Sequence, residues 1–288
     1  MVDGQGPTTT RRRLRFELRR LREEMGLLQG DVAARLDWSQ SKLVRIENGS
    51  VGISVTDLRA LLNVYRAPEE TVDDLVELAR NARGRRWWSQ YRDLLKPAYQ
   101  EFIGFEEEAT RLRQYHATMV PGLLQTEAYM RALIPALVLS PSPESRYEAL
   151  VQVRLHRQRE IVFSDSPTDL EVLIDEAALR RPVGGTATMH AQLSHIAEAQ
   201  GRAAVSVAVL PFSAGPHVGM AGPFHIIEFA AEADDDVLYL ETAQGDMAFR
   251  DQPDLVAQYS KCLDRMLDLS LRGDAAVDFL RTLADESA

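Results

Sequence analysis

Four side chains able to recognise nucleic-acid bases lie close together in the sequence, at Gln40, Ser41, Lys42 and Arg45. In the major groove of double-stranded DNA, a glutamine amide can pair with adenine through two hydrogen bonds, and arginine or lysine can pair with guanine. Such contacts require the side chains to lie on the outer, N-terminal part of a helix. A helix capped by Ser39 meets this requirement, so the pattern predicts base contacts from all four residues.

Other polar residues around this stretch suit the DNA backbone. Gln29 begins the preceding helical segment and Asn48 follows the candidate recognition helix, where side chains and backbone amides can meet phosphates. A run of arginines opens the patterned part of the chain, and we expect Arg11, Arg12 and Arg13 to contact phosphates too. Taken alone, such a run also suits a solvated helix face. Phosphate contacts set the register of a protein on DNA rather than its sequence preference.

The surrounding helices must hold these side chains in place. Apolar residues recur at helical spacing over 11–25 and again over 29–48. Ala33 is small enough for two helices to cross closely, and Trp38 supplies an apolar residue just after the turn. The residues expected in one shared core are Leu14, Leu18, Leu21, Met25, Val32, Leu36, Leu43 and Ile46.

Two further helices complete the module, one capped by Ser54 and one opened by Pro68. We therefore expect a flexible tail over residues 1–10 and an all-α, five-helix domain over 11–82.

The stretch REEMGLLQGDVAARLDWSQSKLVRIENG resembles the Cro/C1-type (XRE-family) helix-turn-helix of lambda-repressor-like regulators. The resemblance implies a DNA-binding domain in which Arg22 and Glu47 form a buried structural ion pair. Two positions depart from the family pattern: Asp37 replaces the glycine of the turn, and Leu28 replaces a capping Ser or Thr. Asp tolerates a left-handed backbone, whereas Leu cannot cap a helix, so we expect a loosely held start to the second helix.

The bulk composition points to two domains. The chain has 288 residues, 45% of them hydrophobic, and a net charge of −10. The charge is uneven, because residues 1–86 carry a net +3 and residues 87–288 a net −13, so only the first part suits DNA. Cys262 is the single cysteine, which excludes an internal disulfide or a thiolate metal cluster. The sequence has no signal peptide or membrane span, and we expect a cytoplasmic protein.

Residues 83–288 predict an α+β domain with a small mixed sheet of about four strands and flanking helices. The expected strands are 170–175, 204–210, 224–229 and 237–241, with the helix near 187–199 joining the first two and an antiparallel hairpin for the last two. The expected helices are 100–117, 124–134, 144–163, 187–199, 253–270 and 274–285.

This region resembles an actinobacterial Scr1-type antitoxin-like (DUF5753-like) domain. The motifs that carry the resemblance are WWSQYRDL, FEEEATRLRQY, VPGLLQTEAYMRAL, RLHRQ, LIDEAALRRPVGG, AQLSHI, VLPFSAG and GPF. The resemblance implies a regulator often paired with a small partner protein.

The sequence contains no phosphate loop, metal motif or nucleophile arrangement, so we expect neither an enzyme nor a cofactor or metal. Arg154, Arg157, Glu176 and His217 are candidates for a small-molecule effector or partner site, and buried ion pairs are the alternative. We expect a homodimer that binds a double-stranded DNA operator through two half-sites. The competing hypothesis is an antitoxin-like interaction module that sequesters a small partner protein.

Overall fold

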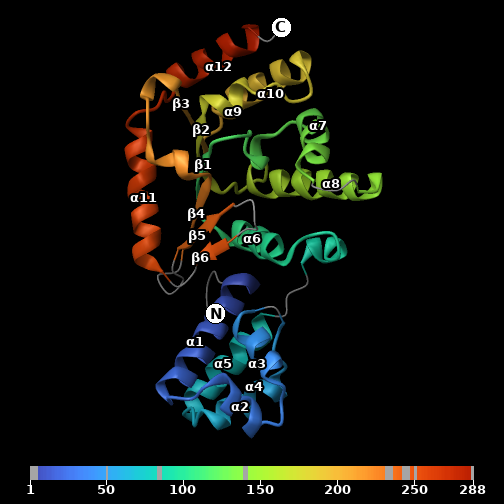
Figure 1. Cartoon of the computed structure of the whole chain (residues 1–288), viewed down its shortest axis with the longest axis vertical. Coiled ribbons are helices and arrows are strands. Elements are labelled where there is room, and N and C mark those ends of the chain that lie inside the picture. The colour runs from blue at the N-terminus through green and yellow to red at the C-terminus, as the bar shows by residue number, and fades with distance from the viewer. Residues whose placement is uncertain are drawn as a thin grey trace. The chain divides into compact units, whose positions relative to one another are not determined.

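The computed structural model describes residues 6–49, 51–82, 86–138, 142–230, 236–241, 247–249 and 252–286, without the side chains of 247–249. The chain divides into two compact units, Met1–Ser89 and Gln90–Ala288 (Figure 1). The sequence predicts a domain boundary between residues 82 and 83. Residues 83–85 lie outside the described residues. Each unit is considered by itself below.

The first unit is all-α, as predicted. Its helices are α1 (Pro7–Glu24), α2 (Gln29–Arg35), α3 (Gln40–Glu47), α4 (Val55–Val64) and α5 (Glu69–Asn81). The prediction of a flexible tail over residues 1–10 is wrong for 7–10, because these residues form the first turn of α1. Pro7 favours this early start, since proline fixes a helical φ angle and lacks the N–H that a first-turn residue leaves unpaired. The hydroxyl of Thr10 also donates to the carbonyl of Gly6 at 2.7 Å.

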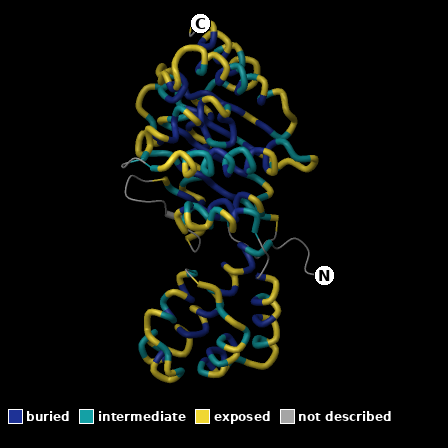
Figure 2. The backbone as a smooth tube through the Cα atoms, turned by 90° about the vertical axis from the view of Figure 1, so that its right-hand side faces the viewer, coloured by how far each residue is buried: buried dark blue, intermediate teal, exposed yellow. Residues whose placement is uncertain are grey.

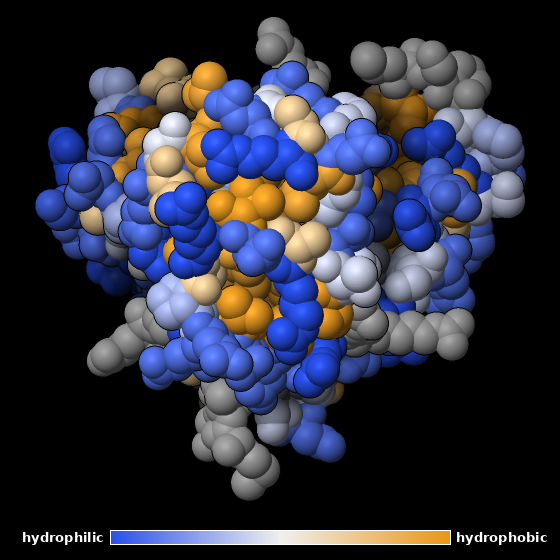
Figure 3. Space-filling model, turned by 90° about the horizontal axis from the view of Figure 1, so that it is seen from below, coloured by the Kyte–Doolittle hydropathy of each residue, from blue (hydrophilic) through white to orange (hydrophobic). Residues whose placement is uncertain are grey.

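One apolar core holds the five helices together. It contains the periodic leucines of α1 together with residues from every other helix, and Met25, expected inside, is instead exposed. Figure 3 shows that hydrophobic residues also reach the surface on the face seen from below, between hydrophilic ones. The buried core residues are Leu14, Leu18, Leu21, Val32, Leu43, Ile46, Leu58, Leu61, Leu62, Tyr65, Leu75, Val76 and Ala79.

The turn between α2 and α3 adopts the geometry that its sequence indicates. Asp37 has φ = 56°, the left-handed conformation for which glycine is usual. The backbone N–H of Trp38 then donates to the carbonyl of Ala33 at 2.9 Å, which closes the end of α2. Ala33 is 2% exposed, so there is no room for a larger side chain where the helices cross.

The second unit is α+β and contains one mixed sheet in the order β3-β2-β1-β4-β5-β6. Strands β1, β2 and β3 run parallel, and β4 pairs antiparallel with both β1 and β5. The strands are β1 (Arg111–His116), β2 (Asp169–Asp175), β3 (Val205–Leu210), β4 (Phe224–Glu228), β5 (Val237–Leu240) and β6 (Met247–Phe249). The helices are η2 (Gly122–Leu124), α6 (Pro97–Glu108), α7 (Glu127–Leu137), α8 (Glu144–Ile161), α9 (Glu176–Arg180), α10 (Thr186–Ala199), η3 (Phe212–Ala214), η4 (Val218–Ala221), α11 (Pro253–Leu267) and α12 (Asp274–Glu286), while η1 (Trp87–Tyr91) spans the division between units.

The expected set of about four strands omitted β1 and β6. Residues 100–117 were predicted to form one helix, but α6 ends at Glu108 and β1 follows. The error has a physical cause, since β1 buries Arg113, Gln114 and His116 where a central strand normally carries apolar residues. The four predicted strands and the antiparallel pairing of β4 with β5 are confirmed.

Helices cover both faces of the sheet (Figure 1), and the buried residues lie along the inner stretches of the chain (Figure 2). Residues of α6, α7, α10 and α12 share one core with Leu112, Val172 and Val207 of the sheet. Helix α11 lies on the opposite face, where Leu263 and Met266 pack against alternate residues of the same strands.

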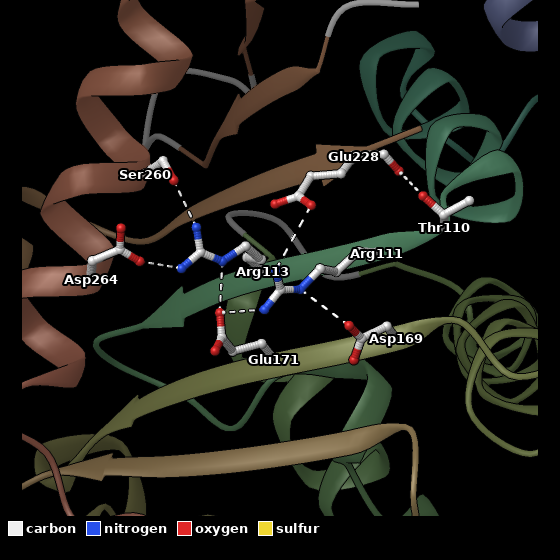
Figure 4. Close-up of polar contacts among 8 residues, drawn as sticks. All are labelled: Thr110, Arg111, Arg113, Asp169, Glu171, Glu228, Ser260 and Asp264. Carbon is white, nitrogen blue, oxygen red and sulfur yellow. Dashed lines mark hydrogen bonds and ion pairs between the residues drawn. The ribbon is translucent and has the colours of Figure 1, made fainter. Parts of the chain in front are cut away.

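Ion pairs also lie on the face of the sheet that α11 covers (Figure 4). The guanidinium of Arg113 donates to Glu171 at 2.6 Å, to the hydroxyl of Ser260 at 2.7 Å and to Asp264 at 2.5 Å. Arg111, on the same strand, lies 3.2 Å from Asp169. Because Ser260 and Asp264 belong to α11, Arg113 fastens this helix to the strand and obtains partners for its own buried charge.

Candidate nucleic-acid interface

Helix α3 has one buried face and one exposed face. Leu43, Ile46 and Glu47 are buried, whereas Gln40 and Arg45 are exposed. Ser39 caps the helix, since its hydroxyl oxygen accepts a hydrogen bond from the backbone N–H of Lys42 at 3.2 Å.

The exposed side chains of α3 are held only lightly. The Nε of Arg45 donates to the carbonyl of Ser41 one turn earlier, at 3.2 Å, and the exposed Ser41 hydroxyl lies 3.2 Å from that of Ser39. Gln40 makes no side-chain hydrogen bond to any described residue. Helix α3 therefore presents an amide and a hydroxyl outward from its first turn and a guanidinium from its last turn, and these groups can read base edges.

Lys42 differs from its three neighbours because its ammonium is engaged within the protein. Its Nζ lies 3.1 Å from Oδ1 of Asp57 on α4 and 3.7 Å from the centre of the Trp38 ring. The lysine and aspartate side chains are each 34% exposed. Sequence reasoning grouped Lys42 with the base contacts because nothing in the linear pattern reveals Asp57 as its partner.

A buried ion pair joins α1 to the end of α3. Nε and Nη2 of Arg22 donate to the two carboxylate oxygens of Glu47, at 2.7 and 3.0 Å. The hydrogen bond to Glu47 raises the pKa of Arg22, so the guanidinium stays charged. The side-chain amide of Gln29, expected at a phosphate, donates to the same carboxylate at 2.8 Å. The side-chain amide of Gln29 is thus engaged within the protein.

Two arginines that the sequence analysis did not name as DNA contacts lie beside the C-terminal end of α3. Arg15 and Arg19 of α1 donate to the backbone carbonyls of Asn48 and Glu47, each at 3.4 Å. With Arg22 they form a stripe at spacings of four and three residues, which places all three on one helix face. The spacing of these arginines is the sequence signal from which their shared helix face could have been predicted. Asn48 itself is exposed.

The three arginines at the start of α1 have different surroundings. Arg13 is exposed, as a phosphate contact requires. Arg11 is also exposed, but its Nε donates to the carbonyl of Ala82 at 2.8 Å. Arg12 is only 6% exposed, unlike its two neighbours in the arginine run. It lies on the same helix face as the buried Thr8 and Thr9, one turn earlier.

The candidate effector residues of the second unit are engaged by several different partners. Arg157 makes a bidentate ion pair with the fully buried Glu106, at 2.6 and 2.7 Å, and a hydrogen bond to the Tyr99 hydroxyl. Burial opposes the charge of Arg157, but these partners outweigh it and raise the guanidinium pKa. Arg157 is therefore part of the core between α6 and α8, as in the alternative reading of buried ion pairs.

The other three residues also have partners of their own. Glu176 accepts from Arg180 at 2.6 Å and from the backbone N–H of Phe212 at 2.7 Å. His217 lies 3.4 Å from Asp175, and Arg154 lies 3.5 Å from Gln125. A surface hollow of about 300 Å³ does exist on α8, and its lining residues are Gln152, Leu155, Gln158, Arg159 and Phe163. None of the four candidates lines that hollow.

The described residues include no group of three or more His, Cys, Asp or Glu able to hold a metal ion. Within the same described set, no helix combines the length and the apolar character needed to cross a bilayer.

The fold and the exposed face of α3 define the class of the first unit, which is a helix-turn-helix domain. Residues 13–75 match the family described as "Helix-turn-helix domain". Residues 99–282, more than half of the chain, match the family described as "Domain of unknown function (DUF5753)", and the chain belongs to this family. No curated protein and no solved structure gives a significant match. Neither family description names an enzymatic activity.

Proposed function

We propose that the protein is a sequence-specific regulator of transcription that inserts α3 into the major groove of double-stranded DNA. The observation that carries the proposal is the division of α3: its inner face is buried in the core of the first unit, while Gln40, Ser41 and Arg45 project from the other face. Only a rigidly held helix can present side chains to base edges with a fixed register.

The phosphate contacts in this proposal surround α3. The N–H groups at the start of α2, beginning at Gln29, meet one phosphate, and the exposed Asn48 meets another. Arg11 and Arg13 add positive charge from the first turns of α1. Arg15 and Arg19, beside the end of α3, extend the same positive surface.

The test compares two variants on the duplex that the wild-type protein enriches from a random-sequence library. Gln40→Ala should weaken binding by about 1–3 kcal/mol and relax the preference at one base position. Arg13→Ala should weaken all sequences alike and lower the salt slope by about 0.9. Identical behaviour of the two variants, or wild-type binding without salt dependence, would overturn the proposal.

The second unit is assigned to association and regulation. In this proposal two copies place their α3 helices on half-sites about one helical turn of DNA apart. Exposed apolar side chains between β3 and β4 support an association surface, since Phe212 is 60% and Met220 73% exposed. Met220→Glu should lower the mass measured by light scattering, whereas the control Leu137→Glu, at a 48% exposed site on α7, should not.

A second candidate function is an antitoxin-like module in which the same apolar turn binds a small partner protein. Salt-dependent binding of the wild-type protein to its enriched duplex favours the regulator, because phosphate contacts release counterions. A protein that binds a partner but no duplex favours the module instead.

A further inference from the structure

We propose that Lys42 is a positioning residue rather than a DNA contact: held by Asp57 and Trp38, it fixes the N-terminal turn of α3 so that Gln40 and Ser41 face the bases. This inference rests on the proposed function and assigns a different role to one residue of the same surface.

Three contacts define the setting of Lys42. Its backbone N–H donates to the Ser39 hydroxyl at 3.2 Å, its ammonium lies 3.1 Å from Asp57, and the same ammonium lies 3.7 Å from the centre of the Trp38 ring. A cation over an indole face, with a carboxylate beside it, is attracted by both groups. The three partners belong to the turn before α3 and to the first turn of α4, so Lys42 links both to the recognition helix.

Helix electrostatics explain why this pairing matters. Lys42 is the third residue of α3, where a positive charge is disfavoured by the helix dipole. Asp57 is the third residue of α4, where a negative charge is favoured, and its backbone N–H donates to the capping hydroxyl of Ser54 at 3.0 Å. Asp57 is therefore a well-anchored anion that offsets the unfavourable charge on α3.

The ion pair with Asp57 also distinguishes Lys42 from its neighbours on α3. To reach a base edge, its ammonium must leave both the carboxylate and the indole ring. Gln40 gives up no described hydrogen bond, and Arg45 gives up a single bond to a backbone carbonyl. Among these three residues, reaching DNA therefore costs Lys42 the most, because it alone would lose an ion pair and a cation–π contact.

The test measures the ratio of affinities for the wild-type-enriched duplex and for a random duplex. Lys42→Met keeps the apolar stem over Trp38 and removes the charge, while Asp57→Asn removes the opposite charge. Each should lower the ratio by about threefold to tenfold, the range for a partly exposed ion pair with a cation–π contact. Lys42→Met should leave the salt slope on the enriched duplex unchanged, because no phosphate contact is lost. The matched control is Asp73→Asn, which breaks the exposed pair of Asp73 with Arg59 at 3.7 Å and should leave the ratio unchanged.

A charge exchange separates positioning from direct contact. Lys42→Asp alone should lower the ratio at least as much as Lys42→Met, and adding Asp57→Lys should restore part of the lost ratio, since the ion pair is rebuilt in reverse while the contact of the Lys42 ammonium with Trp38 is not. Failure of this rescue would overturn the inference, as would a salt slope about 0.9 smaller for Lys42→Met or an unchanged ratio for either single variant. Wild-type protein that binds neither duplex would instead refute the proposed function, and the role of Lys42 with it.

Discussion

The buried pair of Arg22 and Glu47 offers the most informative test of how the first unit holds α3. Replacing Glu47 by Ala removes a side chain that is only 2% exposed and that accepts two hydrogen bonds from Arg22 and one from Gln29. The guanidinium keeps its bonds to the carbonyl of Leu27 at 3.0 Å and to the exposed Glu23 carboxylate at 3.3 Å, but it loses its main counterion.

The expected cost is large because a charge is left buried. Breaking one partner of a buried pair costs about 3–5 kcal/mol. The Arg22 side chain is 11% exposed and retains the Leu27 carbonyl, so we expect a value near the lower limit, about 3 kcal/mol. Gln29 is half-buried and can turn to water, and it adds little to this cost.

Amide hydrogen exchange in the full-length protein measures this free energy, because the second unit serves as an internal reference. Protection should fall about 150-fold across α3, at 1.4 kcal/mol for each factor of ten. The matched control is Glu17→Ala, which removes a carboxylate 2.7 Å from Arg20 on the surface of α1 and should cost less than about 1 kcal/mol.

A double replacement, Arg22→Met with Glu47→Leu, sharpens the test. Apolar residues of similar size often replace a buried ion pair without loss, so this variant should recover most of the stability lost in Glu47→Ala. If Glu47→Ala unfolds within about 1 kcal/mol of wild type, or if the double variant is no more stable than the single one, the stranded-charge reasoning is wrong.

Three further outcomes follow from the same structure. Leu28→Ser should stabilise the first unit by about 1 kcal/mol in urea unfolding, because Leu28 stands at the start of α2, is 72% exposed and cannot cap; Leu28→Ala should give no such gain. Asp37→Gly should also add about 1 kcal/mol, since φ is 56° there; a loss would mean that the carboxylate makes a contact worth more than the backbone relief. Burial, assisted by the neighbouring His225, lowers the pKa of His116 to about 3. In the unfolded chain the pKa of this histidine is about 6.5, so between that pH and pH 3 the unfolded chain binds a proton that the folded chain does not bind. The free energy of unfolding of the second unit should therefore fall by up to about 1.4 kcal/mol per pH unit as the pH is lowered to 3. His116→Asn should flatten this pH profile of urea unfolding, whereas Asn at the exposed His190 should not.

The limits of sequence prediction are clearest in β1 and Arg157. The stretch RLRQYH lacks an apolar alternation because both of its faces are buried and three of its buried residues, Arg113, Gln114 and His116, are polar. Arg113 finds Glu171 on β2 and Asp264 on α11, and Arg157 finds Glu106 on α6. A polar residue with a distant partner has the same local pattern as a surface residue, so its burial cannot be predicted from spacing.

Local chemistry by itself determined the course of α3 and its surroundings. The Ser39 cap, the left-handed Asp37 and the apolar spacing of Leu43 and Ile46 act within a few residues, and the sequence alone therefore predicts where α3 begins and which face it buries. Only the tertiary structure decided what each charged group does. Lys42 and Arg45 are equivalent in the sequence, but Asp57 approaches one of them and not the other. Electrostatic interactions depend on distances across the fold, and those distances exist only once the chain has packed.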